Sequence, residues 1–362
     1  MPVTDRVNPE SKAERVVDEL RSRIVAGHLS PGSQLPTWDD MVRHFRVTRP
    51  TLTRAMERLK RDGFIHATRA RGTFVADRLP HLTRFGVVFS SSPTWTFSGL
   101  GGWNRFWDLL AMTVPALEKD LDLELPLFFE VISPQSRGAI RLAGELRRGR
   151  LGGLILVGTH ELLAVPAINR ADVPRVGIYD LPERVDFPCV YVDSQSFVDR
   201  SLDALAERGR RRVAILTNET ATFGMFEQAL AQRGLQSKPF WRLMINPACA
   251  RNVVRLLLDH PPQDRPDALI VADDHLVEQA LAGVIAAGVR VPEELAVVTH
   301  CNWPRPPANP VPTVQLGYDA RAILRTSIDL LQHQRQGDTP AHMTRVPARL
   351  NSEVELGVDV PR

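Results

Sequence analysis

The chain has few cysteines, few aromatic residues and no long apolar run. Of its 362 residues only three are cysteines, and Cys189, Cys249 and Cys301 are widely spaced and form no CxxC pair. An odd number of isolated cysteines indicates free thiols in a reducing compartment. The opening MPVTDRVNPESKAER has no apolar segment typical of a secretory signal, and no stretch reaches the roughly 18 apolar residues of a membrane span. We therefore expect a soluble, cytoplasmic protein.

Aromatic residues make up 6% of the chain, whereas hydrophobic residues make up 43% and are mainly Val, Leu, Ile and Ala. This aliphatic composition favours helices packed on a parallel sheet. The length suggests two or three domains.

Catalytic motifs are also lacking. After Lys119 the only lysine is Lys238, in the turn-like GLQSKPFW, a context unsuited to a buried Schiff base. There is no G-x-S-x-G elbow, P-loop or H-E-x-x-H sequence, and the ten histidines show no ligand spacing with Cys or Asp. The sequence thus predicts no catalytic residues, no cofactor and no metal site.

Positive charge is concentrated in the N-terminal fifth. Residues 1–80 contain 15 Lys/Arg against 10 Asp/Glu, whereas the remainder contains 30 against 32. Between residues 41 and 75, nine cationic side chains are opposed only by Glu57 and Asp62. Such a patch indicates a nucleic-acid partner rather than a merely solvated face.

Two short helices are predicted within this patch. Thr37 is expected to cap the first, and Thr48 the second, which has Pro50 in its first turn. In the second helix one apolar stripe follows the i, i+3, i+4, i+7 spacing of a buried face: Leu52, Ala55, Met56 and Leu59. This is a helix-turn-helix layout, in which residues near the start of the second helix read bases in a major groove.

A wing is predicted after the helices, because GFIHATRARGTFVADR reads as two short strands with cations at the tip. We therefore expect a double-stranded DNA partner. The candidate DNA-contacting residues of helices and wing are Thr37, Thr48, Arg49, Thr51, Thr53, Arg54, Arg71, Gly72 and Thr73.

The rest of the chain alternates apolar runs with helical stretches. Strands are expected at 85–90, 125–132, 152–158, 175–180, 212–217, 267–273 and 294–300. Helices are expected at 104–119, 136–149, 195–209, 222–234, 249–260 and 275–288. This alternation predicts an α/β fold with two lobes of doubly wound parallel sheets, which bind ligands in the crevice outside the carboxyl ends of the strands.

Candidate ligand-binding residues follow those strands directly. Asp274 is interpreted as a helix cap. The candidate effector-binding residues are Ser91, Trp95, Tyr179, Asp180, Asn218, Thr222, Phe223, Asp273, Cys301, Asn302 and Trp303.

The N-terminal segment resembles the winged helix-turn-helix of the GntR family of bacterial repressors. The motifs are "G-x-L-x-P-G-x-x-L-P", "V-[ST]-R-x-T" and "G-T-F-V", here GHLSPGSQLP, VTRPT and GTFV. The resemblance implies operator contacts by Thr48, Arg49, Thr51, Arg54 and Gly72. Asp39 stands where many members have an Arg that contacts DNA, and Arg46 stands where the turn usually has Gly.

The region from about 84 to 352 resembles the effector-binding region of LacI/GalR repressors, which is similar to periplasmic sugar-binding proteins. The similar phrases are RLGGLIL, VYVDSQSFVDRSLDALAERGRRRVAIL, GVRVPEELAVVTHCNW and RVPARLNSEVEL. The fusion of a GntR-like DNA-binding segment to this region resembles the domain arrangement of the arabinose-repressor subgroup. Two of three sugar anchors differ in type: Thr222 replaces an Arg, and Cys301 replaces an Asp.

The expected organisation is a winged helix-turn-helix at 1–78, a linker at 79–84 and a two-lobed effector domain at 85–362. Lobe 1 is expected at about 85–190 and 313–340, and lobe 2 at about 191–312 and 341–352, with crossings near 190, 312 and 340. The resemblance implies a homodimeric transcriptional repressor whose operator affinity responds to a small polar, sugar-like effector. One alternative is an effector domain that has lost its ligand response and serves only for dimerisation. An enzyme domain fused to a DNA reader is a weaker one.

Overall fold

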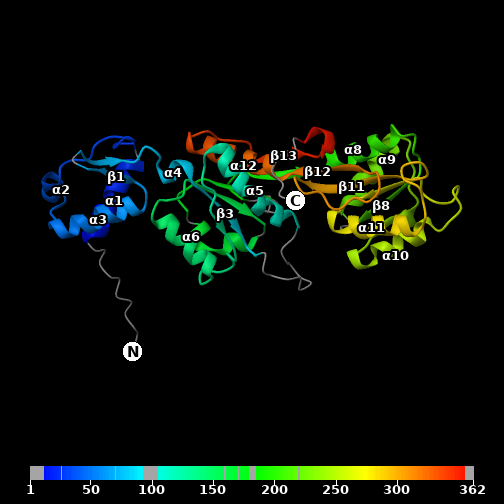
Figure 1. Ribbon diagram of the computed structural model, residues 1–362, viewed down its shortest axis with the longest axis horizontal. Helices are drawn as coiled ribbons and strands as arrows, with labels where there is room; N and C mark the ends of the chain where they lie inside the picture. Colours follow the sequence, from blue (N-terminus) through cyan, green and yellow to red (C-terminus); the bar gives the residue numbers. More distant parts are fainter. Residues whose placement is uncertain are drawn as a thin grey trace, which may run out of the picture. The chain divides into compact units, whose positions relative to one another are not determined.

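A computed structural model describes residues 12–25, 27–69, 71–92, 105–158, 160–169, 171–178, 185–218 and 221–354 (Figure 1). The chain divides into two compact units. The first comprises residues 1–91 and 118–175, and the second comprises 92–117 and 176–362. No helix within the described ranges is both long enough and apolar enough to cross a membrane.

The first unit begins with the predicted helix-turn-helix and wing. Its core is built from the stripe on the third helix, where Leu52 and Leu59 are fully buried, together with Val17 and Phe64. The hydrophobic contact between the first and third helices places the stripe inside and leaves the opposite face of the third helix to solvent. The elements are α1 (Lys12–Val25), α2 (Trp38–Phe45), α3 (Arg49–Arg61), β1 (Ile65–Thr68) and β2 (Gly72–Val75).

The turn between α2 and α3 has the geometry of its motif but not all of its expected bonds. Thr37 caps α2, accepting a hydrogen bond from the Asp40 amide at 3.3 Å. Arg46 ends α2 in the left-handed region, with φ 51° and ψ 48°. Thr48 occupies the N-cap position of α3 but makes no capping bond, because its hydroxyl lies 2.9 Å from the hydroxyl of Thr51. Thr48 is therefore the N-cap residue of α3, as expected, but its side chain makes no capping bond.

The wing is an antiparallel hairpin in which Ile65 pairs with Val75 and Thr68 with Gly72. Gln34, in the segment before α2, fastens its tip by donating from Nε2 to the Arg71 carbonyl at 2.9 Å. Gly72 has φ 113°, and a Cβ there would lie 2.7 Å from Gln34 Nε2. Glycine is required here both for the backbone angle and for this close approach.

The rest of the first unit is α/β. Strand β3 runs parallel to β4 on one side and to β5 on the other, with β3 and β5 buried along their whole length. Ser136 caps α6 by accepting from the Ala139 amide. The elements are α4 (Pro80–Thr83), β3 (Phe85–Phe89), β4 (Leu127–Phe128), α6 (Arg137–Arg147), β5 (Gly153–Val157), η1 (His160–Ala164) and α7 (Pro166–Asn169).

The second unit contains a six-stranded sheet in the order β14-β12-β11-β10-β8-β9, parallel except for β14. Its strands are β8 (Val213–Thr217), β9 (Arg242–Met244), β10 (Ala268–Val271), β11 (Ala296–Trp303), β12 (Val314–Asp319) and β14 (Arg349–Leu350). Its helices are α8 (Ser194–Ala206), α9 (Ala221–Gln232), η2 (Pro239–Trp241), α10 (Pro247–Leu258), α11 (Asp274–Ala286), α12 (Ala320–Arg335) and η3 (Asn351–Glu353), with most of α5 (Arg105–Leu121).

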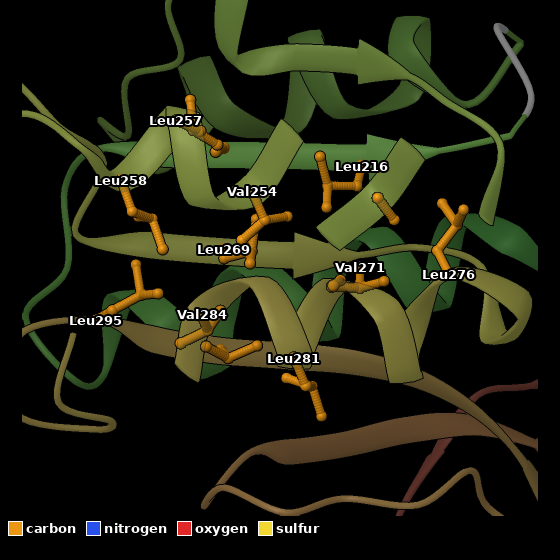
Figure 2. Close-up of a cluster of buried hydrophobic side chains, with 14 of the residues drawn as sticks. Leu216, Val254, Leu257, Leu258, Leu269, Val271, Leu276, Leu281, Val284 and Leu295 are labelled. Atoms are coloured by element: carbon orange, nitrogen blue, oxygen red, sulfur yellow. The ribbon is translucent and has the colours of Figure 1, made fainter. Parts of the chain in front are cut away.

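Helices α10 and α11 lie against one face of β8, β10 and β11, and their aliphatic side chains form the core shown in Figure 2. The two helices are in close contact at Gly283, where a Cβ would lie 2.5 Å from the Arg251 carbonyl oxygen and 2.8 Å from Val254 Cβ. Val254, Leu269 and Leu281 are fully buried. Glycine at position 283 therefore sets the spacing of this helix layer.

A second group of strands in this unit differs from the expected lobe limits. Strand β7 (Cys189–Asp193) lies parallel to β6 (Arg175–Ile178) and to β13 (Met343–Pro347). Strand β12 instead pairs with β11 along six residues. The chain consequently changes sheets after Asp193, close to the expected 190, and after Asp319 and Pro347, later than the expected 312 and 340. Six residues of β12 pair with β11, so residues 314–319 extend that sheet and not the group that contains β7.

Candidate nucleic-acid interface and ligand cavity

The face of α3 opposite its buried stripe carries the predicted reading residues. Arg49, Thr53 and Arg54 are exposed and Thr51 is half-buried. Thr53 turns its hydroxyl back to the Arg49 carbonyl, at 3.0 Å, which leaves the two guanidinium groups as the longest donors on this face. Guanidinium forks suit the O6 and N7 acceptors of guanine.

Arg49 forms an ion pair with Asp39, the residue that departs from the motif of the resembled family. Its Nη2 lies 2.6 Å from Asp39 Oδ1, and both side chains are about 70% exposed (71% and 69%). Asp39 lies in the first turn of α2, so this ion pair joins the start of α2 to the start of α3.

The wing brings three further candidates to the surface. Arg71 and Gly72 are exposed and Thr73 is half-buried, while the Thr73 carbonyl accepts from the Leu35 amide at 2.8 Å. Thr37, at the start of α2, is exposed, and its hydroxyl donates to Asp40 at 2.6 Å. Backbone bonds therefore fix the wing relative to α2.

A ligand-sized cavity of about 240 Å³ lies within the second unit. Its polar wall joins the start of α5 to the start of α11 through Arg105, which donates to the Asp274 carbonyl at 3.2 Å and pairs with Glu278 at 3.3 Å. Arg305 lies on the loop after β11 and approaches the Met112 sulfur at 3.4 Å. The lining residues are Arg105, Asp108, Leu109, Met112, Asp274, Glu278, Asn302, Arg305, Pro306, Pro307 and Ala308.

Asp274 and Asn302 form the deep side of this cavity. Asn302 donates from Nδ2 to Asp274 at 2.9 Å, and both residues are almost fully buried. The Asn302 Oδ1 atom is buried without a hydrogen-bond partner within the described ranges. A buried acceptor without a partner can accept a hydrogen bond from a ligand, for example from a hydroxyl group.

His275 supports this wall electrostatically. Its Nδ1 lies 3.0 Å from an oxygen of Asp273 and 3.0 Å from an oxygen of Asp274. The hydrogen bonds to Asp273 and Asp274 raise the pKa of His275 to about 9, against the opposing effect of burial. Burial would raise the pKa of Asp274, but hydrogen bonds from His275 and Asn302 and the nearby histidine charges lower it to about 2.

The same three residues are the set within the described ranges whose spacing could hold a metal ion, with ligand atoms within 4.8 Å of one another. In this structure the three groups also contact one another, through His275 Nδ1 and an oxygen of each carboxylate.

Of the residues predicted to bind the effector that the structure describes, Asn302 lines this cavity. Ser91 is buried, with no hydrogen bond to its hydroxyl within the described residues, and Asn218 is exposed after β8. Phe223 is half-buried on α9. Asp273, rather than Asp274, caps α11 by accepting from the His275 amide at 2.7 Å. Trp95, Tyr179, Asp180 and the Thr222 side chain lie outside the described residues.

Cys301 and Trp303 are core residues. Strand β11 continues to Trp303, so the expectation that these positions follow a strand ending at 300 is wrong. Both side chains have no exposed surface, and they pack with Val354. Burial raises the pKa of the Cys301 thiol. Neither side chain offers a surface to a ligand in this structure.

Sequence reasoning missed the cationic part of the cavity. Arg105 begins the helix at 105–121, and Arg305 lies in WPRPP after β11. Both residues adjoin elements that the sequence predicted. The signals that could have indicated them as cavity residues were an Arg at the start of a helix and an Arg within a proline-rich loop. Their convergence depends on the tertiary fold.

Comparison with known proteins agrees with a helix-turn-helix segment followed by a ligand-binding fold. Residues 12–75 match the model of bacterial regulatory proteins of the gntR family, and residues 202–352 match the periplasmic binding protein-like domain. The chain is similar to the arabinose metabolism transcriptional repressor of Geobacillus stearothermophilus, with 23% identity over 88% of this chain and 92% of the repressor. The repressor of that name from Halalkalibacterium halodurans is 20% identical over 91% and 92%.

Two solved structures show the same fold. A LacI-family regulatory protein from Chloroflexus aggregans aligns with a TM-score of 0.57 and 19% identity, covering 75% of this chain and 97% of that protein. The CelR regulator, solved with cellobiose, aligns with a TM-score of 0.53 and 19% identity, covering 87% and 98%.

A GntR-type helix-turn-helix joined to a periplasmic-binding-protein-like domain defines the chain as a DNA-binding transcriptional regulator. The two arabinose repressors extend over both parts, so the chain shares their domain organisation as well as each separate fold.

Proposed function

We propose that the protein is a homodimeric, cytoplasmic repressor that reads a specific operator through α3 and the wing. The observation that carries this proposal is the outward placement of Arg49 and Arg54 on α3, above a stripe of fully packed apolar residues. The wing supplies Arg71 and a close backbone approach at Gly72. Two such readers in a dimer would contact two half-sites of a pseudo-palindrome.

Within each reader the residues have different roles. Arg49 and Arg54 contact base edges, Thr48 and Thr51 contact the adjacent phosphate through their paired hydroxyls, and Arg71 contacts the backbone or minor groove beside the wing. Thr37, Thr53, Gly72 and Thr73 position these groups, because their polar atoms or backbone already bond within the reader.

The effector is a small polyhydroxylated molecule held in the cavity of the second unit. Support comes from the unpartnered Asn302 oxygen, from the charged pair Asp274 and His275 behind it, and from Arg305 at the loop. The repressors of arabinose metabolism and the CelR–cellobiose complex suggest a sugar-like ligand. A ligand that prefers one conformation of this region changes operator affinity by that differential affinity.

One observation favours the second candidate, a repressor without ligand response. Cys301, at a position where sugar-binding relatives carry an Asp, is buried in the core rather than facing a ligand. In that case the effector region serves dimerisation alone. Neither candidate includes catalysis, and incubation with sugars or sugar esters should give no turnover.

The DNA proposal is tested by binding to the protein's own upstream region. Full-length protein is titrated at two salt concentrations against this DNA and against a scrambled fragment, alongside Arg49→Ala and Arg54→Ala. Each variant should lose about 1–3 kcal/mol for the operator. Arg255→Ala, on an exposed position of α10, is the matched control and should bind as the parent does. Equal binding of both DNA fragments by all four proteins contradicts specific reading.

The effector proposal is tested by a thermal-shift screen of pentoses, hexoses, sugar acids and polyols. A compound that raises the melting temperature should lose this effect in Asn302→Leu, while Asn218→Leu, on the exposed position after β8, should keep it. If no compound shifts either the melting temperature or the operator affinity, the ligand-independent repressor is the correct reading. Sedimentation equilibrium of the full chain checks the dimer.

A further inference from the structure

A second cavity, of about 330 Å³, lies in the first unit where the end of α3 meets the segment after α6. Its lining is almost entirely cationic: Arg58, Arg61, Asp62, Arg148 and Arg150. Four guanidinium groups around one small cavity repel one another unless enough negative charge is nearby.

The protein supplies too little negative charge for these groups. Arg148 and Arg150 share a single carboxylate oxygen of Glu145, at 3.4 and 3.3 Å, and Arg84 pairs with the other oxygen. Although burial opposes it, the hydrogen bond from Arg84 and the three guanidinium charges lower the pKa of Glu145. Arg84 has a second partner in Glu124, at 2.9 Å, whereas Arg148 and Arg150 have ion pairs only with Glu145 within the described structure.

The two cations from α3 are no better compensated. Arg58 has a single long pairing, 3.4 Å to Glu14, and Arg61 makes no ion pair within the described parts of the chain. The side chain of Arg61 is exposed, so its charge is available to a ligand.

The one acid in the lining forms a single long ion pair within the described structure. Asp62 is 4% exposed, and its nearest cation, Arg21 Nη2, lies 3.6 Å away, too far for a hydrogen bond. One Asp62 oxygen is buried with no hydrogen-bond donor in the described structure. A ligand that fits here should bring negative charge for the arginines and a hydroxyl for Asp62.

The cavity is built on a packed junction rather than on loose surface side chains. Arg21 of α1 is buried and donates from Nη1 to the Arg147 carbonyl at 2.9 Å, at the end of α6. A Cβ at Gly149 would lie 2.7 Å from Arg21 Cδ, so the two segments are in direct contact. Arg58 and Arg148 thus face the cavity from parts of the chain that the Arg21 contact holds together.

We propose that this cavity is a phosphate-binding site, occupied by inorganic phosphate or by the phosphate group of a small phosphorylated metabolite. Guanidinium groups donate in pairs to phosphate oxygens. Asp62 accepts a hydrogen bond from the hydroxyl group that inorganic phosphate keeps at neutral pH. In a phosphate ester, a neighbouring alcohol group donates this hydrogen bond instead. Sulfate, which has no hydroxyl, meets only the repulsion of Asp62. Ligand binding at this junction would fix α3 relative to α6.

Isothermal titration of the full chain at pH 7 and constant ionic strength, without DNA, tests the site with sodium phosphate, glycerol 3-phosphate and sodium sulfate. We expect saturable binding of at least one phosphate compound, about ten-fold tighter than that of sulfate. Arg61→Gln and Arg148→Gln should each weaken it by about ten-fold, while the exposed control Arg255→Gln should leave it unchanged. Binding that is equal for sulfate, or unaffected by both variants, overturns the proposal.

Asp62→Asn tests the selectivity, since the amide removes the charge that repels sulfate. Its phosphate-to-sulfate preference should fall to near one; an unchanged preference overturns the role of Asp62. Because Asp62 faces Arg21, the melting temperature of the Asp62→Asn variant is first compared with that of the parent protein. If this variant unfolds, the two arginine variants still test the site.

The backbone of DNA is the other source of phosphate for these arginines. Operator titrations of Arg148→Gln at two salt concentrations distinguish it. If neither phosphate compound binds and Arg148→Gln both weakens operator binding and reduces its salt dependence, the arginines belong to the DNA interface and the proposal is wrong.

Discussion

The guanidinium of Arg49 and the carboxylate of Asp39 form a direct ion pair, 2.6 Å between Nη2 and Oδ1, joining the first residue of α3 to the first turn of α2. Because both side chains are largely exposed, the pair contributes only about 0.2–1 kcal/mol to stability. Its effect is on the position of Arg49, which is pre-oriented, and on the local charge near DNA.

Replacing Asp39 should therefore alter DNA binding more than folding. Asp39→Ala removes a negative charge beside the phosphates and frees Arg49, so binding to scrambled DNA should tighten by about three- to ten-fold and the operator preference should fall. Fluorescence anisotropy with operator and scrambled duplexes measures both quantities. Asp40→Ala removes the same charge from the same turn but leaves the Arg49 pair, and it should tighten scrambled-DNA binding without reducing the preference. A preference that falls equally in both variants rules out orientation by Asp39.

Arg46 stores backbone strain that a glycine would release. Its left-handed φ of 51° costs about 1–2 kcal/mol for a residue with a Cβ, whereas glycine adds about 0.4–1 kcal/mol of unfolded-chain entropy. Arg46→Gly should thus raise the unfolding free energy by up to about 1.6 kcal/mol. Arg46→Ala keeps the Cβ and should give no gain. Urea denaturation followed by circular dichroism compares the two; equal stabilities would show that φ strain is not the cause.

The His275 triad predicts a pH-dependent part of the stability. The folded-state pKa of His275 is about 9, above the unfolded value, so its stabilisation is complete below about pH 6.5 and is lost as pH rises through 9. His275→Gln should cost about 1–3 kcal/mol at pH 6 and almost nothing at pH 10. Denaturant titrations at these two pH values measure the difference. His260→Gln, on an exposed histidine, should cost little at either; a His275→Gln penalty that is constant with pH contradicts the assigned protonation.

Gly283 tests the spacing of α10 and α11. A Cβ there meets the Arg251 carbonyl at 2.5 Å, so Gly283→Ala should separate the helices and destabilise the protein by about 1–3 kcal/mol. Gly224, inside α9, has open space around its Cβ position, and Gly224→Ala should stabilise by about 0.5–1 kcal/mol through helix propensity alone. Thermal unfolding of the two single variants checks the opposite signs. If neither variant loses stability, α10 can move away from the added methyl group at position 283 without a cost in free energy.

The reader was predictable because its signals are local. The spacing of Leu52, Ala55, Met56 and Leu59 fixes the buried face of α3, and the same spacing fixes which residues face outward. The α/β alternation of the remainder was equally clear, since β3, β5, β8 and β10 are continuous apolar runs buried on both faces.

Other features depend on contacts between distant segments. Helix α12 (Ala320–Arg335) was not expected, because Asp319 ends β12 and caps the helix directly, at 2.9 Å to the Arg321 amide, with no intervening turn sequence. Strand β11 was expected to end at 300, but pairing with β12 extends it to Trp303. Arg105 and Asp274 are 169 residues apart, and only folding brings them to one cavity.

Trp303 offers a spectroscopic readout of this region. Its indole is fully buried, and its Nε1 donates to the Arg349 carbonyl at 3.4 Å. Any rearrangement that draws β14 away from β11 must hydrate this indole and shift its emission to longer wavelength. A Trp303→Phe difference spectrum would isolate that signal from the other tryptophans. The molecule therefore contains its own fluorescent reporter of movement next to the cavity that Asn302 lines, usable before any ligand is identified.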